Sequence, residues 1–452
     1  SQCDRGPDRE GFEVSRGSRL LLADALAAEG VAVLTESDAL EVEDYSSRTR
    51  EELKQGLVGA AGLIVRSGTQ ADEDLIDAGT SLRVIGRAGV GLDNVDVDAA
   101  TRRGIAVLNA PAGNTVSTAE LAFALLMSVA RRIPASDRSV RDGSWDRNAF
   151  RGSQLAGKTL GVVGAGRIGA EVILRARAFG MKVLVADPYM SAGRAADLSV
   201  ELLELDDMLP RADFVTLHLP LTPETGALLN AERIRALKPT ARLVNAARGG
   251  ILDEHALAEA LTEGRLAGAA LDVFEQEPLP MDHPLRSAPN LVLTPHLGAA
   301  TDDAQREVAV EIALAVRAAL VNGDYRAAVN MPPSLPRDRE RMKPVLDLAE
   351  RLGAVLGEHA RGGLSEVSVQ YGGEVQRGLR LITSAVLIGL LQRQLEVSLN
   401  LINALMVARE RGISVSRARV GELAGYRGML EVRVTVSGEQ HTVVGGMRDD
   451  GR

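Results

Sequence analysis

The sequence predicts an α/β protein with two doubly wound parallel-sheet domains and a C-terminal α+β domain. Three observations indicate this organisation. From Arg19 onward, short apolar runs alternate with amphipathic stretches, which is typical of parallel strands joined by helices. A second series of the same kind begins at Lys158. A proline-rich segment, residues 330–336, then interrupts the pattern before residues 337–452, where longer helical runs and alternating strands follow.

The first series contains five apolar runs of strand length. Helical spacing is expected between them, near residues 50–57 and 72–77. A longer apolar helix is predicted over residues 115–132, with Ser117 near its start. The polar, mixed-charge residues 1–18 are predicted to be a disordered tail. The predicted strands of this series are residues 20–23, 31–34, 62–65, 83–85 and 105–108.

The second series contains six strands with helices between them, as in a nucleotide-binding sheet. These strands are residues 159–163, 182–186, 213–218, 241–246, 268–273 and 291–294. The C-terminal domain, residues 337–452, is expected to hold both helices and strands. Its helices are predicted at residues 342–358, 381–394 and 399–411, and its strands at residues 365–371 and 431–437.

Composition excludes several classes of function. The 452 residues carry a net charge of −9, which disfavours binding of a nucleic-acid phosphate backbone. No nucleic-acid partner is therefore expected. The most apolar stretches, residues 121–130 and 381–391, are shorter than the ~20 residues of a membrane helix. The single cysteine, Cys3, permits no internal disulfide and fits the cytoplasm. The sequence contains no cluster of His and Cys residues, so it predicts no metal site.

A glycine motif follows the first strand of the second series. Gly164, Gly166 and Gly169 form G-x-G-x-x-G at the start of a helix predicted over residues 167–179. In this context the glycines allow a tight turn, approach of a pyrophosphate and close helix packing. The next strand ends in Asp187, an acid suited to the ribose hydroxyls and repulsive to a 2′-phosphate. The motif therefore predicts NAD rather than NADP.

Three polar residues lie where later strands of this series end. Arg248 offers a planar fork for a carboxylate, His296 can exchange a proton near neutral pH, and Glu277 can orient the imidazole. Beside a nicotinamide, this set suits reversible oxidation of a 2-hydroxy acid. Taken singly, each residue has an ordinary structural explanation, and the residues alone leave both interpretations open.

Several motifs resemble the D-2-hydroxyacid dehydrogenase family. These are residues 164–169, 245–250, 271–278 and 295–299. Further motifs resemble the phosphoglycerate dehydrogenase branch of that family, namely residues 64–67, 86–94 and 109–114. The likeness is close from Arg19 to about Asn330 and looser beyond, where it follows the regulatory domain of the long forms. No segment resembles their serine-sensing ACT domain, so the sequence does not predict serine feedback.

The resemblance implies roles for individual residues. His296 would be the acid/base, Glu277 its partner and Arg248 the carboxylate anchor. Residues implied to bind NAD are Gly164, Gly166, Arg167, Ile168, Asp187, Ala247 and Asp272. Residues implied to bind the substrate are Arg66, Ser67, Arg87, Asn114 and, from a neighbouring subunit, Arg147.

The resemblance also implies the domain arrangement. Residues 19–113 and 299–330 would form a substrate-binding domain, and residues 114–298 an inserted NAD-binding domain. A homodimer or homotetramer is implied. The expected reaction is NAD-dependent oxidation of 3-phosphoglycerate, the first step of serine synthesis. Two alternatives stay open: another D-2-hydroxy acid (glyoxylate, hydroxypyruvate or 2-hydroxyglutarate), or an NAD-sensing, corepressor-like interaction protein.

Overall fold

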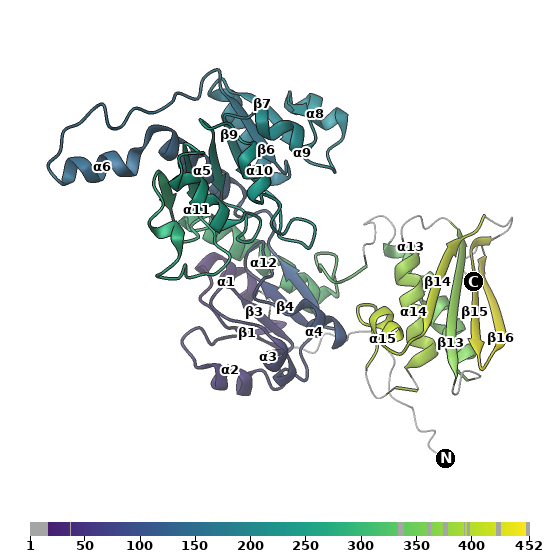
Figure 1. The fold of residues 1–452 in the computed structure, drawn as a ribbon. Helices are drawn as coiled ribbons and strands as arrows, with labels where there is room; N and C mark the ends of the chain where they lie inside the picture. The colour runs from purple at the N-terminus through teal and green to yellow at the C-terminus, as the bar shows by residue number, and fades with distance from the viewer. Residues whose placement is uncertain are drawn as a thin grey trace, which may run out of the picture. The chain divides into compact units, whose positions relative to one another are not determined.

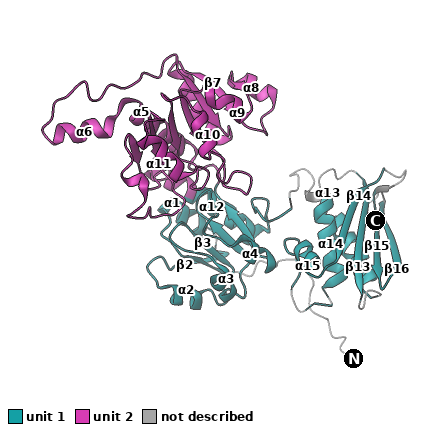
Figure 2. Cartoon of the chain, viewed as in Figure 1, with its two compact units in different colours: residues 1–110, 309–452 teal, residues 111–308 magenta. Residues whose placement is uncertain are grey.

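The computed structural model describes residues 17–36, 38–332, 339–358, 363–373, 378–392, 394–395, 398–421 and 426–448. The chain divides into two compact units, Ser1–Ala110 with Ala309–Arg452, and Pro111–Val308 (Figures 1 and 2). The described residues form two parallel sheets and one mixed sheet, which confirms the predicted fold class. The predicted domain boundaries stay a prediction. Residues 1–16 of the predicted tail and residues 333–336 of the linker lie outside the described residues.

The first sheet has the strand order β2-β1-β3-β4-β5, and all its strands are parallel. Ser18, the last residue of the predicted tail, is buried and begins β1. A Cβ on Gly86 would lie 2.6 Å from Val316, so glycine allows α12 to pack closely on this sheet. The elements are β1 Ser18–Leu22, α1 Ala28–Thr35, β2 Leu40–Asp44, α2 Arg50–Gly56, β3 Gly62–Val65, α3 Glu73–Ala78, β4 Val84–Arg87, α4 Val97–Arg102, β5 Ala106–Asn109 and α12 Asp302–Asn322.

One predicted strand of this sheet is wrong. Residues 31–34 lie in α1, and the strand that pairs with β1 is β2 instead. Only Gly30 and Leu34 are buried in α1, which is the four-residue spacing of a helix face. The β-branched run suggested a strand, but burial of a single face fixes it as a helix.

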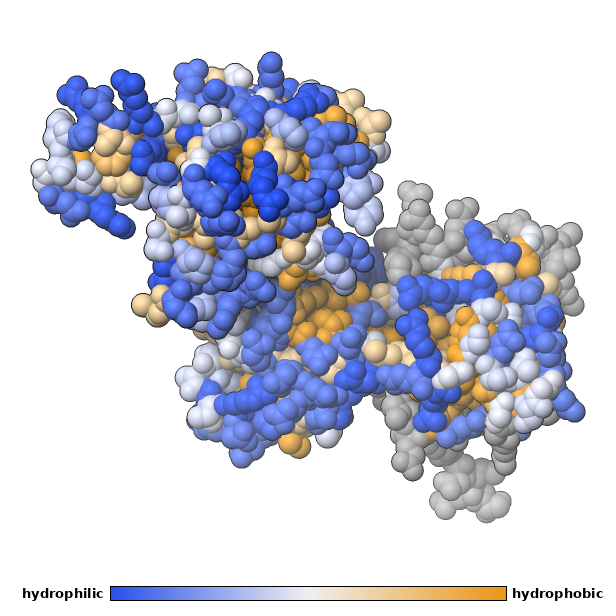
Figure 3. Space-filling model, viewed as in Figure 1, coloured by the Kyte–Doolittle hydropathy of each residue, from blue (hydrophilic) through white to orange (hydrophobic). Residues whose placement is uncertain are grey.

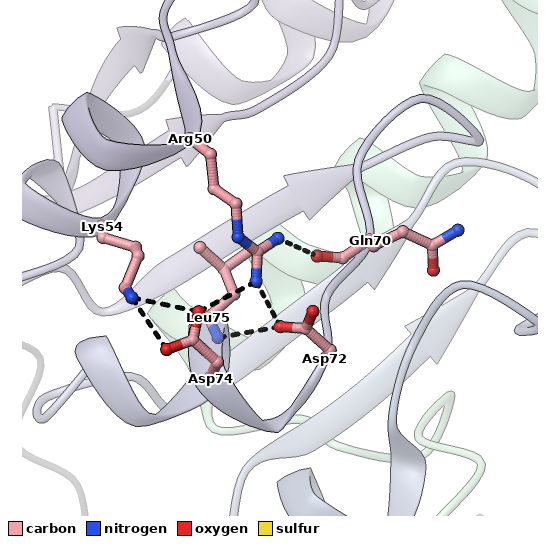
Figure 4. Close-up of polar contacts among 6 residues, drawn as sticks. All are labelled: Arg50, Lys54, Gln70, Asp72, Asp74 and Leu75. Atoms are coloured by element: carbon pink, nitrogen blue, oxygen red, sulfur yellow. Dashed lines mark hydrogen bonds and ion pairs between the residues drawn. The ribbon is translucent and has the colours of Figure 1, made fainter.

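Charged side chains join α2 to α3 at the surface of this unit (Figure 4). The Arg50 guanidinium contacts Asp72 and Asp74, and Lys54 Nζ lies 2.8 Å from Asp74 Oδ1. Asp72 is also the N-cap of α3, because its Oδ1 accepts the Leu75 N–H at 3.0 Å. The network therefore holds the start of α3 against α2.

The second sheet has the order β12-β11-β10-β9-β6-β7-β8 and is also parallel throughout. Helices α5 and α7 pack on one face, and α10 and α11 on the other. All six predicted strands are present, whereas the two-residue exposed strand β8 was not predicted. The elements are α5 Thr115–Arg131, α6 Ile133–Arg141, β6 Thr159–Val163, α7 Arg167–Ala178, β7 Lys182–Ala186, α8 Ala192–Leu198, β8 Glu201–Leu202, α9 Leu205–Met208, β9 Phe214–Leu217, α10 Ala231–Ala236, β10 Arg242–Asn245, α11 Glu254–Thr262, β11 Gly268–Leu271 and β12 Leu291–Leu293.

The third sheet has the order β14-β13-β15-β16 and mixes parallel and antiparallel pairs. Alternate residues of β13 and β15 face α13 and α14 and form a separate hydrophobic core. Strand β14 was not predicted, since its residues are mostly exposed and it lies at an edge. The elements are α13 Arg339–Gly357, β13 Leu364–Gly373, α14 Leu379–Leu391, α15 Ala404–Glu410, β14 Ser414–Arg419, β15 Tyr426–Val436 and β16 Glu439–Arg448.

Hydrophilic side chains cover most of the face drawn in Figure 3. Within the described residues, no helix is both long and apolar enough to cross a bilayer.

Candidate active site

The glycine motif lies between β6 and α7, as predicted. Gly164 has φ +84°, and a Cβ there would lie 2.5 Å from the backbone oxygen of His218. A Cβ on Gly169 would lie 2.2 Å from the Gly164 oxygen, so glycine lets α7 approach the turn. A Cβ on Gly166 would point into open space, and no described side chain caps α7. The first N–H groups of α7 are therefore accessible to an anion, which fits the pyrophosphate of NAD.

Asp187 lies at the end of β7 and holds the backbone around the motif. Its Oδ2 accepts the Ala165 N–H and its Oδ1 the Tyr189 N–H, both at 2.9 Å. Each oxygen keeps a further lone pair, so the carboxylate can still accept from two ribose hydroxyls. Arg167 and Ile168 occupy the first turn of α7, where Arg167 donates to the Pro111 oxygen at 3.3 Å.

His296 and Glu277 form a hydrogen-bonded pair after the ends of β12 and β11. His296 Nδ1 lies 2.7 Å from Glu277 Oε2, and both side chains are partly exposed. Glu277 Oε1 accepts the Phe274 N–H at 3.0 Å. The pair borders a cavity of about 510 Å³, whose apolar wall includes Phe274, Leu279 and Leu293. Nδ1 of the imidazole is thus engaged by a carboxylate, whereas Nε2 has no hydrogen-bond partner among the described residues and is available to a ligand.

The loop that carries His296 is fixed by Asp272, which has no exposed surface. Asp272 Oδ1 accepts from Thr294 Oγ1 at 2.6 Å and from the Leu297 N–H at 2.8 Å, and Oδ2 accepts the Gly298 N–H at 3.0 Å. Burial raises the pKa of Asp272, and these donors oppose the rise. Both oxygens therefore serve the loop. Thr294 was not predicted as part of the site.

Arg248 and Ala247 lie in a turn that follows β10. Asn245 is buried, and its side chain donates to the Arg248 oxygen at 2.9 Å and accepts the Ala247 N–H at 3.0 Å. Arg248 Nη1 donates to the Ala247 oxygen at 2.7 Å. The turn thus fixes the backbone of the predicted carboxylate anchor.

The other compact unit holds three of the predicted substrate residues. Arg66 and Ser67 follow β3, and Asp24, which follows β1, anchors their loop. Asp24 Oδ2 accepts the Arg66 N–H at 2.6 Å and the Thr69 N–H at 3.2 Å. Buried Asn94 donates to the Arg66 oxygen at 2.5 Å. Neither Asp24 nor Asn94 was predicted, although an acid at a strand end could have drawn attention to Asp24.

The remaining predicted substrate residues are Arg87, Asn114 and Arg147. Arg87 ends β4, and its guanidinium occupies the space beside Gly89, whose φ is +151°. Asn114 is the N-cap of α5, and its buried Oδ1 accepts no hydrogen bond from the described residues. Arg147 is exposed in the segment after α6.

Two regions of the chain match known protein families. Residues 123–298 match the NAD-binding domain of D-isomer specific 2-hydroxyacid dehydrogenases, and residues 341–452 match the D-3-phosphoglycerate dehydrogenase intervening domain. D-3-phosphoglycerate dehydrogenase of Synechocystis is 41% identical over 96% of this chain and 78% of its own length. That of Bacillus subtilis is 42% identical over 94% of this chain and 80% of its own length.

The chain belongs to the D-3-phosphoglycerate dehydrogenase family. As a member of that family it is an NAD-dependent D-2-hydroxyacid dehydrogenase, and NAD is its cofactor.

Solved structures of the wider family resemble this chain. The TT0316 protein of Thermus thermophilus is 42% identical, with a TM-score of 0.61 over 68% of this chain and 97% of that structure. The NADPH-dependent glyoxylate/hydroxypyruvate reductase of Sinorhizobium meliloti is 31% identical, with a TM-score of 0.61 over 70% of this chain and 96% of that structure.

Proposed function

We propose that this member of the family oxidises 3-phospho-D-glycerate to 3-phosphohydroxypyruvate, the first step of L-serine biosynthesis. The observation that carries the proposal is the His296–Glu277 pair, with 2.7 Å between Nδ1 and Oε2, in the unit that contains the NAD-binding domain. Relatives that share more than two fifths of its residues carry the name of this activity.

The pair suits proton transfer at the substrate hydroxyl. Glu277 accepts the Nδ1–H, which leaves Nε2 of His296 as the base that takes the hydroxyl proton. Glu277 also stabilises the imidazolium that forms. The first turn of α7 and Asp187 would hold NAD, which would supply the acceptor for the hydride that leaves the substrate carbon. In the reverse direction, His296 returns the proton to the carbonyl oxygen.

Arginines are proposed to hold the two acidic groups of the substrate. Arg248 would bind the carboxylate through its planar fork. Arg87 and, from a neighbouring subunit, Arg147 would contact the phosphate, with Arg66 as a further cationic partner, since a phosphate needs cationic or N–H partners. Ser67 and Asn114 would complete the substrate site, Asn114 through the buried Oδ1 that no described residue engages.

We further propose a homodimer or homotetramer in which a neighbouring subunit supplies Arg147. Helix α6 buries none of its residues, and Ile133, Val140 and Trp145 are 49%, 53% and 77% exposed. Apolar side chains gathered on one surface segment favour a protein partner. With its single cysteine, the chain is proposed to act in the cytoplasm.

A second candidate function keeps the chemistry and changes the acid. It is favoured by the structural likeness to the glyoxylate/hydroxypyruvate reductase of Sinorhizobium meliloti and to a glyoxylate reductase of 29% identity. The difference lies in the substrate, because glyoxylate and hydroxypyruvate carry no phosphate for Arg66 and Arg87.

The test follows NADH absorbance with purified enzyme and several D-2-hydroxy acids. We expect 3-phosphoglycerate to give the highest kcat/KM, above unphosphorylated D-glycerate, glycolate and D-2-hydroxyglutarate. Hydroxypyruvate and glyoxylate are compared with 3-phosphohydroxypyruvate in the reverse direction with NADH. A higher kcat/KM for an acid without a phosphate than for the phosphorylated acid in the same direction would reject the proposed substrate, and no turnover of any acid would reject the enzyme.

A further inference from the structure

Besides Glu277 and Asp272, a further carboxylate, Glu254, lies near the His296–Glu277 pair. It has no part in the proposed proton transfer. Glu254 is the first residue of α11, and only 4% of its surface is exposed. Burial raises the pKa of its carboxyl group, and the hydrogen bond from the Glu275 N–H acts in the opposite direction. Because burying a carboxylate costs free energy unless donors satisfy it, its partners indicate its role.

Both oxygens of Glu254 have a partner. Oε1 accepts the Glu275 N–H at 2.7 Å, and Oε2 lies 3.4 Å from Nε2 of His283. His283 Nδ1 accepts the Leu285 N–H at 3.3 Å, so the proton of the neutral ring is on Nε2 and faces Glu254. His283 is itself mostly buried, and burial lowers its pKa. The carboxylate is thus held by a neutral donor and a backbone N–H.

The partner of Oε1 belongs to the segment that presents Glu277, residues 273–277, here called the Glu277 segment. Two successive N–H groups of this segment are anchored: that of Phe274 by Glu277 Oε1 at 3.0 Å, and that of Glu275 by Glu254. A Cβ on Gly249 would lie 1.8 Å from the Phe274 oxygen, so the segment also lies directly against the turn of Arg248. Glu254 therefore holds a segment that carries Glu277 and lies against the turn of Arg248, so it supports two of the proposed catalytic residues.

We propose that Glu254 is a positioning residue for the oxidation: by holding the Glu275 N–H it fixes the Glu277 segment, and with it the orientation of His296. The expected effect of Glu254 on the reaction rate rests on the proposed function. Its expected effect on the order of the Glu277 segment rests only on the hydrogen bond to the Glu275 N–H. Catalytic groups tolerate little displacement, because an error of about 1 Å can cost on the order of 100-fold in rate.

The catalytic test measures the burst of NADH absorbance, which reports hydride transfer before product release. Glu254→Met fills a similar volume without an acceptor, and Glu254→Ala removes the side chain. We expect both to slow the burst by on the order of 10- to 100-fold with KM for NAD unchanged. Glu254→Gln keeps an amide oxygen for the Glu275 N–H, but its NH2 group faces the His283 Nε2–H, so its rate should lie between those of Glu254→Met and wild type. The matched control is Glu259→Ala, on the same helix, whose carboxylate is 63% exposed.

Repeating the substitutions with Glu277→Gln separates positioning from general destabilisation. If Glu254 acts through Glu277, Glu254→Met should add little further loss once Glu277 is replaced. An unchanged burst rate in Glu254→Met, or an equal loss in both backgrounds, would overturn the proposal.

A second readout needs neither substrate nor NAD. Hydrogen exchange of the Glu275 amide should become faster in Glu254→Met and Glu254→Ala, and stay slow in Glu254→Gln and Glu259→Ala. Unchanged exchange in Glu254→Met would show that Glu254 does not hold the segment. A wild-type enzyme without turnover but with this exchange pattern would reject the proposed function and leave the positioning contact supported.

Discussion

His296 is the residue on which the proposed proton transfer depends most directly. Replacing it with alanine removes the base while Glu277 keeps its bond to the Phe274 N–H. We expect His296→Ala to lower kcat for 3-phosphoglycerate by 10²–10⁴, with little change in KM for NAD. His441→Ala, in the third sheet of the other compact unit, is the control and should leave kcat unchanged. Turnover of His296→Ala at the wild-type rate would assign the proton transfer to another group.

Asp187 is expected to set the choice between NAD and NADP. Its negative charge repels a 2′-phosphate, and its oxygens also hold the Ala165 and Tyr189 N–H groups. Asp187→Asn removes the charge but keeps one acceptor oxygen. The ratio of kcat/KM for NAD to that for NADP should fall by roughly tenfold or more, as expected from loss of a charge–charge repulsion. An unchanged ratio would mean that other groups exclude NADP.

Single residues were predicted where a local pattern carries the information. Gly164, Gly166 and Gly169 belong to one motif, and His296 and Glu277 follow predicted strands. Thr294 and Glu254 were not predicted, because their role depends on a partner distant in the sequence: Asp272 for Thr294 and Glu275 for Glu254. Such pairings are decided by which strand ends the fold brings to one edge of the sheet.

Among elements, the loop after β3 shows how the fold supports the proposed substrate site. Asp24 accepts both the Arg66 and Thr69 N–H groups, so its loss frees the loop that presents Arg66 and Ser67. We expect Asp24→Ala to raise KM for 3-phosphoglycerate about tenfold, in line with loss of a charge-assisted hydrogen bond, without raising KM for NAD. Asp24→Asn keeps one acceptor and should fall between Asp24→Ala and wild type. Equal KM values for all three proteins would mean that Asp24 does not govern the loop.

The type of an element was predictable where its periodicity was unambiguous. The strand predicted at residues 159–163 coincides with β6, and the helix predicted from Arg167 coincides with the start of α7. Residues 31–34 were wrong because Val31-Ala32-Val33-Leu34 has strand propensity, while tertiary packing buries only one helical face. Strand β2 was missed because most of its residues are at least partly exposed, which removes the apolar signal.

At the scale of the whole molecule, the fold class was predictable because alternation of strands and helices is a property of consecutive residues. The order of the strands is not such a property. In the first sheet β1 lies between β2 and β3, and in the second β6 lies between β9 and β7. These orders follow from right-handed crossovers to both sides of a first strand, a rule of packing and not of any one segment.

Global stability should respond to acid through His218, which follows β9 and lies against Gly164 of the glycine motif. Its Nε2 lies 2.9 Å from Thr216 Oγ1, and its Nδ1 is buried without a hydrogen bond to any described residue. Burial lowers the pKa of His218 from 6.5 to about 4, because the fold desolvates the charged ring. The unfolded chain therefore takes up a proton at a higher pH than the folded protein does.

This difference in protonation predicts a defined pH window for the loss of stability. Above pH 6.5 the ring is neutral in both states and has no linkage effect. Between pH 6.5 and about 4 only the unfolded chain is protonated, so stability falls by on the order of 3 kcal/mol across the window. His218→Gln keeps a partner for Thr216 and removes the titration. The measurement is denaturant titration of the whole protein at several pH values, which gives the free energy of unfolding of the unit 111–308. As the pH falls, this free energy should decrease less steeply in His218→Gln than in wild type. Parallel curves for the two proteins would mean that His218 is not the acid-sensitive group, since all other titrating residues are common to both.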